Sequence, residues 1–172
     1  MKILLISLPR TGSHSLMNKL AMESNLKIYS EPFYSKNRNL NKNIIWKNEN
    51  NFILKTIINQ VPEDGIDNIK FYFEFSKNFD KIILLSRKDL VSCTESLSYL
   101  LYNKDRGFTH DRKYSWQLTP NYKETQLYVE KCNSDLNTLS QILGIKIIYY
   151  EDLYDLDSKD RLRFDNLNKN II

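Results

Sequence analysis

The sequence predicts an α/β fold in which a mainly parallel central sheet is flanked by helices. Short, almost wholly apolar runs recur along the chain, as is typical of strands buried on both faces. Segments with apolar residues at helical spacing separate these runs. The expected strands are residues 3–8, 26–30, 52–58, 81–86 and 145–150. Ligands of such sheets bind beyond the carboxyl ends of the strands, so the residues that follow each run are candidates for a site.

Length and composition limit the classes of function. A chain of 172 residues predicts one domain, with loops or a flap at 36–51 and 105–118. Its net charge of +4 suits a small anionic ligand and is too low to indicate nucleic acid. No run approaches the roughly 20 apolar residues of a membrane helix. Cys93 and Cys132 have no metal or redox spacing, which indicates a reducing compartment. Together these observations predict a cytoplasmic protein without a metal, a membrane or a nucleic-acid partner.

The first apolar run leads into a loop and a helix start, within the sequence ILLISLPRTGSHSL. Pro9 and Gly12 end the strand, and Thr11 or Ser13 is expected to cap the helix. Free backbone N–H groups and the helix dipole make such a corner an anion site, usually for phosphate. The expected ligand-binding residues are Arg10, Thr11, Gly12, Ser13, His14 and Ser15. No Lys follows Gly12, so the GxxxxGK[ST] loop of nucleoside triphosphatases is not present.

A second basic corner follows the run at 81–86. Arg87 and Lys88 stand at the end of this strand, and Asp89 is expected to cap the next helix. Ser96 lies about two turns into that helix. The long helix expected after Pro120 ends at Gly144 and precedes the last strand.

Two of these segments resemble the PAPS-dependent sulfotransferases (PAPS is phosphoadenosine phosphosulfate). The loop Pro-Arg-Thr-Gly-Ser-His-Ser-Leu is similar to the family's 5′-phosphosulfate loop, with His14 where Thr is frequent. Arg87 and Ser96 resemble the Arg and Ser that hold the 3′-phosphate, and Lys88 is the alternative cation. The segments SEPF at 30–33 and YEDL at 150–153 also resemble family segments, and we expect YEDL to tie the sheet end to the phosphate loop. The later Arg-Lys-Gly segment of larger members is not found.

The resemblance implies a P-loop-type three-layer sandwich that binds PAPS, releases PAP and needs no metal. The sulfuryl group would pass in line to a hydroxyl or amine of a small-molecule or peptidic acceptor. Glu31 is the expected base, held extended by Pro32, although a surface Glu is the plainer interpretation. Lys55 interrupts an apolar strand and resembles the family's Lys-Thr-His lysine, with Ile57 in place of the His. Arg10 and Lys55 would stabilise the transition state; the plainer interpretation of Lys55 is an edge-strand Lys facing water.

The sequence is also compatible with two other functions. One is a P-loop phosphotransferase that uses ATP, and the other is a nucleotide-binding module without catalytic activity. His110 is a candidate for a flap over the ligand, although a surface position is the more ordinary one. Trp46 and Trp116 are candidates for stacking on adenine, although most such residues belong to the core.

Overall fold

In a computed structural model, the described part of the chain comprises residues 1–34, 49–103, 121–155 and 161–162. The main elements in chain order are β1 (Lys2–Ser7), α1 (Ser13–Ser24), β2 (Lys27–Ser30), β3 (Phe52–Ile57), α2 (Asn68–Ser76), β4 (Lys81–Ser86), α3 (Leu90–Asn103), α4 (Tyr122–Leu143) and β5 (Ile147–Tyr149). A one-turn helix α5 (Tyr150–Leu153) and two short strands, β6 (Tyr154–Asp155) and β7 (Arg161–Leu162), complete them.

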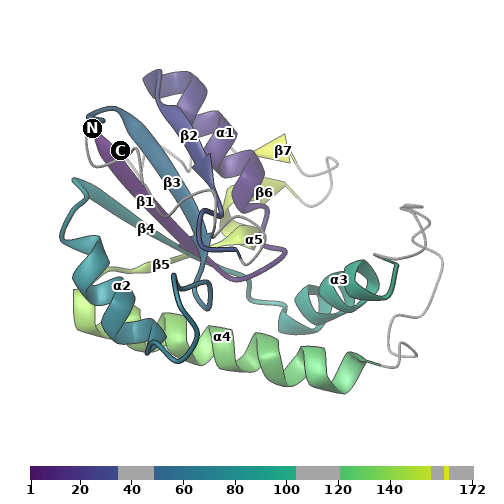
Figure 1. Cartoon of the computed structure of the whole chain (residues 1–172). Helices are drawn as coiled ribbons and strands as arrows, with labels where there is room; N and C mark the ends of the chain where they lie inside the picture. The colour runs from purple at the N-terminus through teal and green to yellow at the C-terminus, as the bar shows by residue number, and fades with distance from the viewer. Residues whose placement is uncertain (35–48, 104–120, 156–160, 163–172) are drawn as a thin grey trace.

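Five strands form one parallel sheet in the order β2-β3-β1-β4-β5 (Figure 1). The register pairs Leu5 of β1 with Lys55 of β3 and with Ile83 of β4. β1 lies at the centre because its residues Ile3–Ile6 are apolar and buried on both faces of the sheet. The carboxyl ends of β1, β3 and β4 therefore meet at the same edge of the sheet.

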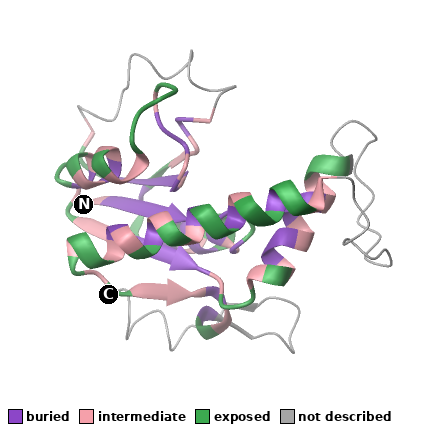
Figure 2. Cartoon of the chain, turned by 90° about the horizontal axis from the view of Figure 1, so that it is seen from below, coloured by how far each residue is buried: buried purple, intermediate pink, exposed green. Residues whose placement is uncertain are grey.

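Helices cover both faces of the sheet, which makes three layers. Ile3 and Leu5 of β1 pack with α1, whereas Leu4 and Ile6 face a second core shared with α2 and α4. This alternation follows from the two-residue period of a strand. Figure 2 shows the buried strands at the centre and the exposed outer surface of α4.

α3 lies beyond the carboxyl ends of the strands and packs on the N-terminal half of α4 (Figure 1). Cys93 and Leu97 of α3 bury against Val129 of α4. At the other end of α4, Gly144 has a φ of 65° and closes the helix, as the sequence predicts.

The predicted fold class is confirmed: the protein has a three-layer α/β sandwich with a parallel central sheet.

One strand prediction needs correction. The run at 145–150 forms only the short strand β5, and its residues are partly buried, because β5 is an edge strand that pairs with β4 alone. The apolar segment FYFEF at residues 71–75 lies in α2. Trp46, His110, Trp116 and the predicted loop at 105–118 lie outside the described residues, as does most of 36–51. Within the described residues, no helix is both long and apolar enough to cross a membrane.

Candidate functional site

A cavity of about 1170 Å³ opens at the carboxyl edge of the sheet. Arg10, Glu31, Lys55 and Arg87, which the sequence places at the ends of four different strands, all line it. Parallel strands bring these residues together because their carboxyl ends share one edge. The two basic corners, at residues 9–15 (the first corner) and 87–96 (the second corner), therefore open onto the same space.

The first corner is built by two residues with left-handed backbone. Arg10 has a φ of 59° and Gly12 a φ of 66°, and Gly12 is the N-cap of α1. The predicted capping by Thr11 or Ser13 is wrong, because no side chain caps this helix. Thr11 is fully buried, and its hydroxyl donates to the carbonyl of Leu8 at 2.9 Å. Thr11 thus holds the loop in shape, and it also lines the cavity.

The uncapped start of α1 faces the cavity. Ser13, His14 and Ser15 form its first turn and line the cavity together with Gly12. N–H groups in the first turn of a helix have no partner within the helix, and the dipole adds positive potential there. The first corner is therefore suited to an anionic group.

A hydrogen bond joins the two corners. Arg10 Nε donates to Ser96 Oγ of α3 at 2.9 Å, and Arg87 Nη1 donates to the carbonyl of Arg10 at 3.4 Å. Arg10 and Ser96 were predicted to bind separate parts of one ligand, and the structure brings them into direct contact. Two guanidinium groups are held in one cavity by this arrangement.

Arg87 is held from behind by the segment that follows β5. Its guanidinium lies 4.9 Å from the ring centroid of Tyr150, and its Nε lies 3.7 Å from Glu151 Oε1. Arg87 Nε is buried and has no hydrogen-bond partner among the described residues. An arginine whose donors are incompletely used is favourable for an anionic ligand.

The YEDL segment has a different contact from the one predicted. Glu151 accepts hydrogen bonds from the backbone N–H groups of Lys88 and Asp89, at 2.9 and 3.1 Å. It therefore ties the sheet end to the second corner and not to the first. Asp89 caps α3 as predicted, since its Oδ1 accepts from the N–H of Ser92 at 3.0 Å.

Lys88 is not part of the cavity. Its ammonium pairs with Asp152 and lies over the ring of Tyr149, and it is absent from the cavity lining. Of the two cations proposed for the second corner, the structure brings only Arg87 to the site.

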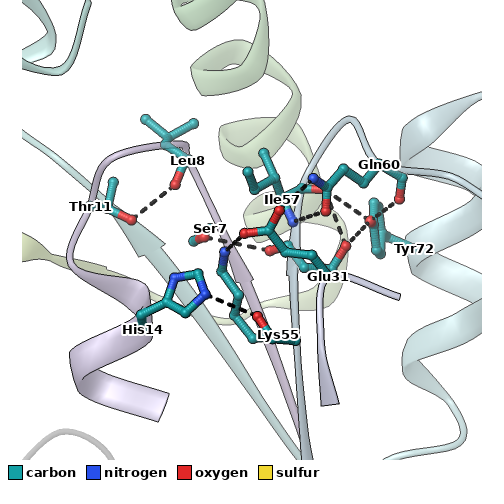
Figure 3. A network of polar contacts seen from close by, with 11 residues as sticks. Ser7, Leu8, Thr11, His14, Glu31, Lys55, Ile57, Gln60 and Tyr72 are labelled. Atoms are coloured by element: carbon teal, nitrogen blue, oxygen red, sulfur yellow. Dashed lines mark hydrogen bonds and ion pairs between the residues drawn. The ribbon is translucent and has the colours of Figure 1, made fainter. Parts of the chain in front are cut away.

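Lys55 and Glu31 form an ion pair at the base of the cavity (Figure 3). Lys55 is 2% exposed and Glu31 is 22% exposed at the side chain. Lys55 lies on β3, an interior strand, so the edge-strand interpretation of this Lys is wrong. Burying a charge is costly unless an opposite charge accompanies it, and Glu31 supplies that charge.

Glu31 has a backbone conformation that its sequence context does not predict. The proline that follows predicts an extended residue, but Glu31 has a φ of 49°. Its N–H donates to the carbonyl of Lys55 at 2.7 Å, which continues the pairing of β2 with β3 by one residue. This backbone contact turns the carboxylate towards the Lys55 ammonium.

Gln60 is a site residue that the sequence analysis missed. Its Nε2 donates to Glu31 Oε2 at 2.9 Å, and its Oε1 accepts from the N–H of Ile57 at 3.3 Å. Behind it, the buried hydroxyl of Tyr72 lies within hydrogen-bond distance of the carbonyls of Ile57 and Gln60 and of Thr56 Oγ1 (Figure 3). The only signal in the sequence was a polar residue just after a strand end, before the turn at Pro62.

Burial and the neighbouring charges change the pKa values of these groups. Burial raises the pKa of Glu31, but Lys55 and the hydrogen bond from Gln60 outweigh this effect and hold the pKa below its ordinary value. Burial lowers the pKa of Lys55, and Glu31 opposes that shift. Burial and the Lys55 charge lower the pKa of His14, whose Nε2 lies 3.0 Å from Ser30 Oγ. At neutral pH the site therefore holds an ionised Glu31 beside a neutral His14.

Comparison with known proteins finds two solved structures that are similar to this chain. No family model and no curated protein matches the chain. The chain is similar to the YorR protein of Bacillus subtilis, solved in complex with phosphorylated GDP, with a TM-score of 0.47 and 11% identity over 87% of this chain and 84% of that one. It is also similar to deoxyadenosine kinase from M. mycoides with bound dATP, with a TM-score of 0.47 and 15% identity over 92% of this chain and 94% of that one.

Likenesses of this size carry no argument about activity, so the function is argued from the cavity itself.

Proposed function

We propose that this protein binds a nucleotide with phosphate groups at two positions and transfers the sulfuryl group of PAPS to a hydroxyl or amine acceptor. One observation carries the proposal: Arg10 and Arg87, from two separate strand–helix corners, face the same cavity. Two separated anionic groups on one ligand would satisfy both corners. PAPS has this charge distribution, with a phosphosulfate at one end and a 3′-phosphate at the other.

The residues present fit such a ligand. The uncapped first turn of α1 and the Arg10 guanidinium would hold the phosphosulfate end. Arg87 and Ser96 both line the cavity and would hold the 3′-phosphate. When bound, PAPS supplies the activated sulfuryl group.

Glu31 is the residue proposed to take the proton of the acceptor. Its pKa lies below the ordinary value, so it is ionised at neutral pH and can accept a proton. Glu31 is held by the Lys55 ammonium and by Gln60 Nε2, and it lines the cavity, where an acceptor hydroxyl would meet it. Lys55 would hold Glu31 in place and add positive potential where negative charge develops.

Phosphoryl transfer from a nucleoside triphosphate is the second candidate. Of the two structures to which the chain is similar, one holds phosphorylated GDP and the other is a deoxyadenosine kinase with bound dATP. The loop argues against phosphoryl transfer, because Arg10 is the basic residue of the first corner and no Lys follows Gly12. A binding module without catalytic activity is the third candidate.

A thermal-shift panel with PAP, ATP, GTP and dATP, each with and without magnesium, separates the first two candidates. We expect PAP to raise the unfolding temperature without magnesium. Stabilisation by ATP or dATP with magnesium, and none by PAP, would show the phosphotransferase to be correct. Transfer of labelled sulfate from PAPS to a mixed acceptor library then separates an enzyme from a binding module.

A further inference from the structure

We infer that the acceptor of this enzyme has an apolar, aromatic body and a positively charged group, and that Glu95 and Glu124 select it. This inference rests on the proposed group transfer and names the class of its acceptor. It is drawn from the part of the cavity between α3 and α4, which the two basic corners do not use.

The cavity is larger than one ligand needs. Pockets for small molecules usually have volumes of about 300–1,000 Å³, and this one has about 1170 Å³. A transferase must hold its donor and its acceptor together, with the reacting atoms in line. The volume beyond the basic corners is therefore the natural place for the acceptor.

Two helical faces form the walls of this region. Ser92, Glu95 and Tyr99 recur every three or four residues along α3 and line the cavity, as do Asn121, Glu124 and Tyr128 along α4. With Tyr34 and Leu100, the two tyrosines add apolar and aromatic surface to these walls. Such walls suit a flat apolar body.

The two glutamates lie at the same level of this cleft. Ser98 Oγ donates to Asn121 Oδ1 at 3.2 Å, and Cys93, earlier in α3, packs with Val129, later in α4. The helices therefore run in opposite directions. Glu95 is one turn before Ser98 and Glu124 is one turn after Asn121, so both lie one turn from this contact, on the side towards the sheet.

The charges of the cavity are separated. Its cations, Arg10, Lys55 and Arg87, come from the strand ends, whereas Glu95 and Glu124 come from the two helices. Neither glutamate has an ion-pair partner within the part of the chain that the structure describes. Carboxylates beside a site for an anionic donor would repel that donor. The same carboxylates would attract a second ligand that brings positive charge.

Three phenols with the same ring and different charge test the inference: tyramine, 4-ethylphenol and 3-(4-hydroxyphenyl)propionate. Binding is measured by saturation-transfer NMR and calorimetry, with and without PAP, on the full chain and on the variants Glu95→Gln and Glu124→Gln. Glu130→Gln is the matched control, because Glu130 is exposed on α4 and lies outside the cavity lining. Comparison of the phenol affinities measured with and without PAP distinguishes attraction of the ammonium group by the nucleotide from its attraction by the glutamates.

We expect the unmodified protein to bind tyramine at least tenfold more tightly than 4-ethylphenol, and the propionate most weakly. Glu95→Gln and Glu124→Gln should each reduce the tyramine preference at least threefold, and Glu130→Gln should leave it unchanged. Equal affinity for the three phenols, no binding of tyramine, or an equal effect of all three variants would overturn the inference. If the protein binds PAP and transfers sulfate but does not distinguish the three phenols by charge, the proposed function stands and the inference about the acceptor falls. If it binds tyramine selectively but does not bind PAP, the proposed sulfate transfer is refuted and the role of the two glutamates stands.

Discussion

Arg10 Nε lies 2.9 Å from Ser96 Oγ, although 86 residues separate the two in the sequence. This contact places the first corner, after β1, against the helix of the second corner, after β4. β1 and β4 are neighbours in the sheet, so the contact is a consequence of the strand order. A ligand that binds one corner must therefore meet the other.

Replacement of Arg10 by Ala should reduce PAP affinity at least tenfold. The change removes a guanidinium whose charge-assisted hydrogen bonds are each worth roughly 1.5–3 kcal/mol, and tenfold corresponds to about 1.4 kcal/mol. Arg10→Lys should recover only part of the loss, because an ammonium lacks the planar donor fork. Calorimetric titration with PAP provides the measurement, and an undiminished affinity of Arg10→Ala would exclude the first corner as the anion site.

Arg87→Ala and Lys88→Ala form a matched pair of variants. They remove the same charge from adjacent residues, but only Arg87 lines the cavity, whereas Lys88 pairs with Asp152. We expect Arg87→Ala to weaken PAP binding at least tenfold and Lys88→Ala to change it less than twofold. An equal loss in both variants would mean that general positive potential, and not a built phosphate site, attracts the nucleotide.

Most of the fold could be predicted from the sequence because the three inner strands β1, β3 and β4 are largely buried. Apolar runs such as residues 82–85 indicate such strands directly, and this run lies within β4. The strand at 145–150 was predicted too long, because an edge strand is specified by its one neighbour more than by its own composition. The parallel sheet then brought Arg10, Glu31, Lys55 and Arg87 to one edge without further information.

The finer geometry of the site depends on tertiary contacts that the spacing of apolar residues along the sequence does not predict. The left-handed backbone of Glu31 comes from its bond to the Lys55 carbonyl, against the local preference that Pro32 imposes. Gln60 becomes a site residue only because the turn after β3 folds back on Glu31. Such tertiary contacts override local rules most often at functional sites.

Glu31→Gln should retain PAP binding, lose sulfate transfer and destabilise the protein. Removal of one partner of a buried ion pair leaves Lys55 uncompensated, at a cost on the order of 3 kcal/mol, the low end of the usual range because Glu31 is partly exposed. The double variant Glu31→Gln with Lys55→Met should recover stability, because no buried charge is left alone, and should stay inactive. Unfolding by denaturant and a labelled-sulfate assay provide the two measurements; full turnover by Glu31→Gln would exclude Glu31 as the base.

The stability of the protein should also depend on pH through Glu31. Its pKa in the folded chain lies below the ordinary value of 4.5, so the unfolded chain takes up the proton first as the pH falls. The stability contributed by Glu31 is therefore fully present above this value and is lost as the pH falls through the folded pKa. Denaturant unfolding between pH 6 and pH 3 should show a steeper loss for the wild type than for Glu31→Gln, and parallel curves would contradict the role of the ion pair.

Gln60→Leu tests whether Gln60 positions the proposed base. The hydrogen bond from Gln60 helps to hold the pKa of Glu31 below its ordinary value, so its removal should raise that pKa. If Glu31 must be ionised for transfer, the acid limb of the kcat profile should move to higher pH, while KM for the donor stays unchanged. Gln60→Glu would place a second carboxylate beside Glu31 and should move the limb further in the same direction. A Gln60→Leu enzyme with lower kcat at every pH and an unmoved acid limb would indicate that Gln60 supports the fold alone.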